Sequence, residues 1–103
     1  MLCIRKNSTS GFMTEELQKY LKDNLKTLKE IVFAGLCSDI CVLNTAVPAK
    51  MYLNQNNISC DVIVPENAID TFDGPGHSRE EYNSIAKKVL RLNGIKVPTK
   101  YER

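Results

Sequence analysis

The chain of 103 residues contains no tryptophan, a single histidine and few aromatic residues. It also has no apolar run of the roughly 18 residues that a membrane-spanning helix needs. Its first residues, MLCIRKNSTSGF, lack the long apolar stretch and the small-residue cleavage site of a secretory signal. We therefore expect no membrane partner and a cytoplasmic location.

Neither sign of charge dominates the sequence. Fourteen basic and 12 acidic side chains give a formal net charge of +2, and the lysines are spread along the chain. Because nucleic-acid binding relies on clustered basic residues that neutralise phosphates, we expect no nucleic-acid partner. The length is below that of a typical ~150-residue domain, so we expect one globular unit.

The four cysteines are few compared with those of disulfide-built miniproteins, and no export signal accompanies them. We therefore expect free thiols at Cys3, Cys37, Cys41 and Cys60. The sequence also lacks a glycine-rich dinucleotide fingerprint, a P-loop, an HExxH motif and a CxxC motif. The usual grounds for a nucleotide-binding, zinc-protease or thioredoxin-like function are therefore missing.

Short apolar runs alternate with amphipathic segments along the chain. The runs at residues 2–4, 31–34, 58–64 and 95–97 predict four strands. The segments between them predict helices, and they are long enough for right-handed crossovers between parallel strands. The order strand, helix, strand, helix, strand, helix, strand predicts an α/β fold with a parallel sheet.

The predicted helices have recognisable starts. Thr14 is a suitable N-cap for the first helix, and Ser78 forms a capping box with Glu81 at the start of the third. Ser38 and Asp39 are both good N-cap residues for the second.

Each predicted helix also has an apolar stripe that we expect to face the core. In the second helix Pro48 predicts either a kink or a helix that restarts there. The three stripes are Leu17, Leu21, Leu25 and Leu28; Ile40, Leu43, Ala46 and Val47; and Tyr82, Ile85, Ala86, Val89 and Leu92.

Cys41 falls in the first turn of the second predicted helix, directly after a predicted strand. Reactive groups in parallel α/β sheets gather at such junctions, and a helix N-terminus favours a thiolate. Cys41 is therefore a candidate nucleophile. The alternative is a small buried thiol packed against the sheet, which suits Cys37 better. A metal site built from Cys37, Cys41 and His77 would need three or four converging ligands, so we predict none.

The segment VFAGLCSDICVLNTA, residues 32–46, resembles the G-x-x-T/S-D-x-C-V-x-x-T-A segment of the isochorismatase-like cysteine hydrolases, the superfamily of nicotinamidase and pyrazinamidase. Residues 6–12 are similar to the family's K-x-x-x-S-A-F segment, with Gly11 in place of the usual alanine. Residues 62–64, 67–68, 72, 76–77 and the closing N-G-I-K-V are similar in order and spacing to the family's C-terminal half. The resemblance covers nearly the whole chain and implies a three-layer α/β/α, Rossmann-like fold.

The resemblance implies that Cys41 attacks the carbonyl of a small-molecule carboxamide, releases ammonia and forms a thioester that water hydrolyses. Lys6 matches the family's catalytic lysine, whose ammonium group would hold the thiolate. Backbone N–H groups of Cys37 and Cys41 would bind the oxyanion, and the family's non-proline cis peptide would fall at Leu36–Cys37. Asp39, next to Ser38, would be structural and anchor the loop.

The resemblance also implies a homo-oligomer, and nicotinamide is our first candidate substrate. The family's catalytic aspartate, and the Asp and His residues of its metal-binding members, have no counterpart here. We therefore expect residues 1–103 to be a single partial domain, the C-terminal part of an isochorismatase-like hydrolase domain with its N-terminal strands missing. We expect no cofactor in this chain, and a divalent metal only in the full-length enzyme.

A second interpretation from another class stays open. The chain would then be a non-catalytic α/β module or pseudoenzyme fragment that completes its sheet with a partner chain, which would explain the missing aspartate. The richness in lysine, asparagine and isoleucine is typical of bacterial proteins.

Overall fold

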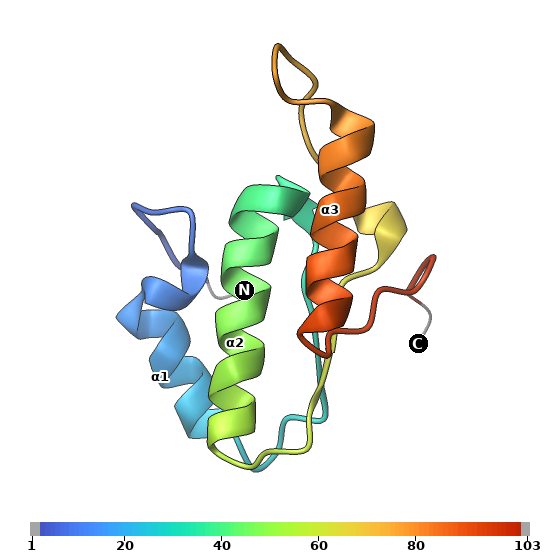
Figure 1. The fold of residues 1–103 in the computed structure, drawn as a ribbon. Helices are drawn as coiled ribbons and strands as arrows, with labels where there is room; N and C mark the ends of the chain where they lie inside the picture. The colour runs from blue at the N-terminus through green and yellow to red at the C-terminus, as the bar shows by residue number, and fades with distance from the viewer. Residues whose placement is uncertain (1–2, 102–103) are drawn as a thin grey trace.

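The computed structural model describes residues 3–101, in which three helices form a layer in front of short parallel strands (Figure 1). The helices are α1 (Glu15–Asn24), α2 (Leu43–Gln55) and α3 (Arg79–Leu92). The strands are β1 (Glu30–Val32), β2 (Gly35–Leu36), β3 (Asp61–Ile63) and β4 (Ile69–Asp70). A π-helix spans Ser38–Val42, and 3-10 turns span Gly11–Met13 and Glu66–Ala68.

The strands pair in parallel, which confirms the α/β class. β1 pairs with β3, with Ile31 opposite Val62, and a parallel bridge joins Ile63 to Lys96 on the other side of β3. β2 pairs with β4, with Gly35 opposite Ile69. The described residues contribute one helical layer of the three-layer arrangement that the resemblance implied (Figure 1).

The strands are shorter than the apolar runs that predicted them. The last hydrogen bond between the two chain segments of the β1–β3 ladder runs from Phe33 N to Ile63 O at 2.9 Å, and on the other side of β3 Val64 N donates to Lys96 O at 2.8 Å. The run at 95–97 is reduced to the bridge at Lys96. The strand predicted at residues 2–4 is not formed at Cys3 and Ile4, where the described part of the chain supplies no neighbouring strand; Leu2 lies outside the described residues.

The core lies between the strands and the helices. Alternate residues of one sheet face meet the inner faces of α2 and α3, and side chains from α1 and β1 pack around them. The buried cluster consists of Val42, Ala46, Leu53, Cys60, Val62, Val64, Leu90 and Ile95.

Two of the three predicted helix starts are confirmed. Thr14 accepts a hydrogen bond from Leu17 N, and Ser78 accepts one from Glu81 N. The N-cap prediction for Ser38 and Asp39 is wrong. The π-helix begins after Cys37, which makes no side-chain cap bond. Ser38 and Asp39 do not cap the helix, because their side chains bind Asn83 and His77.

The inner face predicted for α3 is partly wrong. Ala86 and Leu90 are fully buried, whereas Ile85 is 43% exposed and Leu92 is 86% exposed. The apolar stripe is wider than the face that the core covers, so part of it points to solvent. Among residues 3–101, no helix has both the length and the apolar character needed to cross a membrane.

Candidate active site

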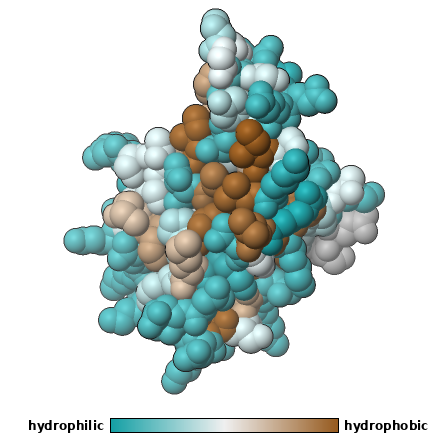
Figure 2. Space-filling view, viewed as in Figure 1, coloured by the Kyte–Doolittle hydropathy of each residue, from teal (hydrophilic) through white to brown (hydrophobic). Residues whose placement is uncertain are grey.

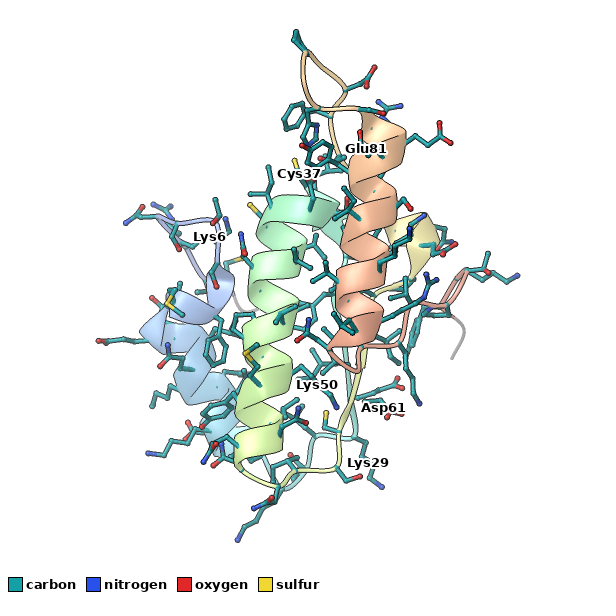
Figure 3. The ribbon with its side chains drawn as sticks, in the orientation of Figure 1. Lys6, Lys29, Cys37, Lys50, Asp61 and Glu81 are labelled. Atoms are coloured by element: carbon teal, nitrogen blue, oxygen red, sulfur yellow. The ribbon has the colours of Figure 1, made fainter. Side chains whose placement is uncertain are left out.

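Lys6 and Cys41 lie together although 35 positions separate them in the chain. Lys6 Nζ is 3.6 Å from Cys41 Sγ and also donates to Ser8 O at 2.9 Å. Figure 3 shows Lys6 on the loop before α1, beside the first turns of the helical segment that begins near Cys37. An ammonium group at this distance stabilises negative charge on sulfur.

The backbone before Cys41 has an unusual path. Gly35 has φ +123°, a conformation that residues with a side chain rarely adopt. The next peptide bond, Leu36–Cys37, is cis, at the position that the resemblance implied. Val42 N then donates to Cys37 O at 3.0 Å, the i to i+5 bond of a π-helix. This wide turn places Cys41 two residues before the first residue of α2, Leu43.

Pro48 explains how the Lys6 segment is held against α2. Proline has no N–H, so it leaves the carbonyl of the residue four positions earlier without its helical donor. That carbonyl belongs to Asn44, and Ser10 Oγ donates to it at 2.6 Å. One residue further along each segment, Gly11 N donates to Thr45 Oγ1 at 2.9 Å. Of the two predicted alternatives, the restart at Pro48 is not observed, since α2 continues through Pro48 from Leu43 to Gln55.

A hollow of about 240 Å³ opens beside the Cys41 thiol. Its volume suits a small molecule rather than a polymer. Within the described part of the chain, its lining contains no carboxylate; the lining residues are Lys6, Gly11, Phe33, Ala34, Leu36, Cys41, Val42 and Thr45. These residues could therefore hold a small, partly apolar molecule next to a thiol and an ammonium group.

Ser38 connects the π-helix to α3 and β4. Its side chain is fully buried, and its hydroxyl donates to Asn83 Oδ1. Asn83 Nδ2 in turn donates to Asp70 Oδ1 at 3.0 Å. The pKa of Asp70 lies below its ordinary value, chiefly because of this bond from Asn83 and the bond from Thr71 N. Ser38 therefore fixes the start of the π-helix to the rest of the fold.

Asp39 forms an ion pair with His77. Asp39 Oδ2 lies 2.7 Å from His77 Nε2, and Phe72 O lies 2.9 Å from His77 Nδ1. Carboxylate and carbonyl oxygens accept hydrogen bonds, so this pair of contacts favours the protonated imidazole, in which both ring nitrogens donate. The ring is stacked between Phe72, at a centroid distance of 3.9 Å, and Tyr82, at 4.1 Å. This pair ties the Cys41 loop to the loop before α3.

The pKa values of the pair follow from this contact. The hydrogen bond to Asp39 raises the pKa of His77 above its ordinary value, although desolvation acts in the opposite direction. Burial acts to raise the pKa of Asp39, but neighbouring Thr71 and His77 outweigh it and lower the pKa. Thr71 Oγ1 and Asp39 Oδ1 make no hydrogen bond of ordinary geometry, so we attribute the lowering mainly to His77.

The remaining cysteines have different surroundings. Cys3 is exposed, Cys37 is half-buried beside the cis peptide bond, and Cys60 is buried in the core. Burial raises the pKa of the Cys60 thiol. Among residues 3–101, no three His, Cys, Asp or Glu side chains lie close enough to hold a metal ion, so these residues do not fit the metal site of the family's metal-binding members.

Sequence reasoning missed several of these contacts. The structure brings three of the predicted site residues, Lys6, Leu36 and Cys41, to one hollow, and the other three, Cys37, Ser38 and Asp39, lie in the segment between Leu36 and Cys41. Sequence reasoning did not find Asn83 as the partner of Ser38 or His77 as the partner of Asp39. The only available signal was that buried serine and aspartate side chains need polar partners, which does not identify those partners.

Comparison with known proteins supports the resemblance. A family model described as the isochorismatase domain matches residues 1–94. An uncharacterized isochorismatase family protein of Bacillus subtilis, PncA, is 32% identical over 75 residues, which are 73% of this chain and 37% of that protein. The Dictyostelium discoideum isochorismatase family protein 2A is 50% identical over 34 residues, which are 33% of this chain and 17% of that protein.

Solved structures give the same result. The crystal structure of the nicotinamidase PncA from Bacillus subtilis matches with a TM-score of 0.69 and 28% identity, over 90% of this chain and 44% of that one. The nicotinamidase of Staphylococcus aureus has the same fold, with a TM-score of 0.71 at 21% identity, over 93% of this chain and 52% of that one. The chain thus spans about half the length of these structures or less. With a family model that matches residues 1–94 and a shared fold, the chain belongs to the isochorismatase family of hydrolases.

Proposed function

We propose that the chain is the cysteine-bearing part of a hydrolase that cleaves the C–N bond of a small carboxamide, with Cys41 as the nucleophile and Lys6 as its cationic partner. The observation that carries this proposal is the 3.6 Å contact between Lys6 Nζ and Cys41 Sγ. The two residues come from separate segments, and dedicated bonds from Ser10 and Gly11 hold those segments together.

In the proposed reaction, the Cys41 thiolate attacks the carbonyl carbon, and the C=O electron pair moves to the oxygen. Backbone N–H groups of Cys37 and Cys41 would bind this oxyanion. When the intermediate collapses, the C–N bond breaks, the nitrogen takes up a proton, and ammonia leaves. Water then cleaves the thioester, which yields the carboxylic acid and regenerates the thiol.

Proton transfer is the step that the described residues do not supply. An acid–base group must take the thiol proton and pass it to the leaving nitrogen. The described lining of the hollow contains no carboxylate that could do this. Because the chain spans only 44% of the Bacillus subtilis nicotinamidase structure, the group would come from a further segment of the same protein or from a partner chain. The same observation favours the second candidate, a non-catalytic module.

We propose nicotinamide as the first substrate to test. The hollow beside Cys41 is small and partly apolar, lined by Phe33 and Leu36, and a planar aromatic amide would fit this chemistry. The similarity to nicotinamidases by fold supports the same substrate class.

Alkylation rates test the cysteine and the lysine directly. We expect iodoacetamide to modify Cys41 faster than Cys3 at neutral pH, although Cys3 is the more exposed thiol. Lys6→Ala should slow the modification of Cys41 by about tenfold, since the charge that stabilises the thiolate is lost. Arg5→Ala removes another exposed positive charge from the adjacent position and should leave the rate unchanged. Equal, slow labelling of all four cysteines would refute the assignment of Cys41 as the nucleophile.

An ammonia-release assay separates the two candidate functions. The assay uses the protein purified from its natural source and nicotinamide as the substrate. The intact mass of the purified protein is measured alongside. If Cys41→Ala abolishes ammonia release and Cys37→Ala does not, the amidohydrolase function is supported. Selective alkylation of Cys41 without any release from a protein of 11.6 kDa would favour the non-catalytic module.

A further inference from the structure

Asp39 lies midway between the two residues whose backbone N–H groups are proposed to bind the oxyanion. It follows Cys37 by two positions and precedes Cys41 by two, within the π-helix Ser38–Val42. Among residues 3–101, no hydrogen bond is donated by Cys37 N, so this group is free to bind an oxyanion. A displacement of Asp39 would therefore move both expected donors.

His77 holds the Asp39 side chain in place. The carboxylate is 10% exposed and the imidazole 14%, and Asp39 Oδ2 lies 2.7 Å from His77 Nε2. The other carboxylate oxygen, Oδ1, is buried and has no hydrogen-bond partner in the part of the chain that the structure describes. Loss of His77 would leave a buried carboxylate without its cationic partner, which costs more than the loss of an exposed pair. We expect the π-helix to shift until the carboxylate reaches water.

The backbone of His77 is fixed by a tight turn. His77 N donates to Gly74 O, and Gly74 N donates to His77 O, both at 2.9 Å. Pro75 and Gly76 occupy the two central positions of this turn, and Gly76 has φ +72°. Proline followed by a glycine with positive φ is the residue pattern of a type II turn. The turn therefore sets where the imidazole can point.

The imidazole ring is packed between two aromatic rings. Phe72 stacks on it at a centroid distance of 3.9 Å and an interplanar angle of 14°, and Tyr82 at 4.1 Å and 23°. The hairpin at residues 72–77 projects beyond the helices, at the top of Figure 2, where the surface is mostly hydrophilic or neutral. Apolar burial therefore does little to hold this hairpin, and the stack and the ion pair with Asp39 do hold it.

We propose that His77 is a positioning residue of the hydrolase, which acts through Asp39 on the backbone N–H groups that stabilise the oxyanion. This inference rests on the proposed function. Neither His77 nor Asp39 belongs to the described lining of the hollow beside Cys41, so neither side chain contacts the substrate. Their effect passes through the π-helix backbone. It acts on the oxyanion and not on the thiolate, which Lys6 stabilises.

Two reagents with different requirements test the proposal. With p-nitrophenyl acetate, the Cys41 thiolate attacks the carbonyl carbon, the oxygen takes the C=O electron pair, and p-nitrophenolate leaves as the C–O bond breaks. This leaving group needs no proton, so the reaction does not depend on an acid–base group. Iodoacetamide alkylates the same thiolate, releases iodide and forms no oxyanion. The ratio of the two rates, each corrected with Cys41→Ala, therefore measures oxyanion stabilisation and cancels the thiolate fraction.

We expect His77→Ala to lower the acylation rate of Cys41 by at least about tenfold and to change its alkylation rate by less than about twofold, because displaced donors bind the oxyanion poorly while Lys6 stays in place. Asp39→Ala should do the same. The double variant should be no slower than either single variant, since His77 acts through Asp39. His77→Gln keeps an N–H for Asp39 but not the charge, so it should lower the ratio by more than about twofold, yet less than His77→Ala.

Leu53→Ala is the control for a loss of stability. Leu53 is fully buried about 15 Å along α2 from Leu43, so its truncation weakens the core away from the π-helix and should leave the ratio unchanged. Circular dichroism identifies the variants that fold. Alkylation of Cys41 as slow as that of Cys3 in the unmodified chain would refute the nucleophile, and this proposal with it. Fast alkylation with an unchanged ratio in a folded His77→Ala or His77→Gln variant, or additive effects in the double variant, would overturn only the role of His77.

Discussion

The contact between Pro48 and the Lys6 segment can be tested by a double-mutant cycle. Proline inside a helix costs about 3 kcal/mol relative to alanine, partly through the missing hydrogen bond. Here Ser10 Oγ supplies the missing donor to Asn44 O at 2.6 Å. We expect Pro48→Ala to raise the free energy of unfolding by about 2 kcal/mol, less than the full value, because Ser10 already offsets part of the cost.

Ser10→Ala should lower the free energy of unfolding by about 1 kcal/mol, since Asn44 O then loses its donor. In the Pro48→Ala background the same change should cost less than half as much, because the new helical N–H at position 48 satisfies Asn44 O. The coupling free energy between the two positions is therefore expected to be about 0.5 kcal/mol or more.

Urea unfolding of the four proteins measures this coupling. With an m-value of about 1 kcal/mol/M, a change of 1 kcal/mol shifts the midpoint by about 1 M. Ser59→Ala, at an exposed position between α2 and β3, is the control and should shift the midpoint little. Strictly additive effects of Ser10→Ala and Pro48→Ala, or destabilisation by Pro48→Ala, would refute the assigned role of Ser10.

Three further predictions concern stability. Gly11→Ala should raise the free energy of unfolding by about 0.4–1 kcal/mol in urea titrations, because the added Cβ would lie 3.4 Å from Thr45 Cγ2, an ordinary contact, and the unfolded chain loses freedom. Leu53→Ala should lower it by about 2–5 kcal/mol, because Leu53 is fully buried. His77→Gln should destabilise the fold more at about pH 5.5 than at about pH 9 in thermal melts. The raised pKa of His77 makes its contribution greatest below the unfolded pKa of ~6.5, and the contribution disappears as pH rises through the folded pKa. An equal loss at both pH values would contradict the Asp39–His77 pair.

Local features of the fold could be predicted from the sequence. Thr14 and Ser78 start their helices as expected, because an N-cap depends on residues within one turn. The α/β alternation was visible for the same reason, since each apolar run and each amphipathic stripe is a local pattern. Cys41 could be placed at a helix start after a strand, where such residues commonly react.

Partners distant in the sequence could not be predicted. Ser38 looks like a helix cap, but Asn83, 45 positions later, accepts its hydroxyl proton. Asp39 was expected to anchor the loop, but its partner could not be identified, because His77 lies 38 positions away. The extent of the α3 face that the core covers also depends on the neighbouring elements, so the exposure of Ile85 was not evident from periodicity.

The π-helix at Ser38–Val42 has a consequence for how this chain tolerates insertions and deletions. A π-turn holds one residue more than an α-turn does, and the extra residue widens the helix locally while α2 continues normally after it. Deletion of Val42 would close the π-turn into a regular α-helix, and Cys41 would then take the position of Val42 directly before α2. Because successive α-helical residues are rotated by about 100°, that deletion would turn the thiol away from Lys6 and toward the core that Val42 occupies. The loss of one residue would thus remove the cysteine–lysine contact although both of its residues are retained.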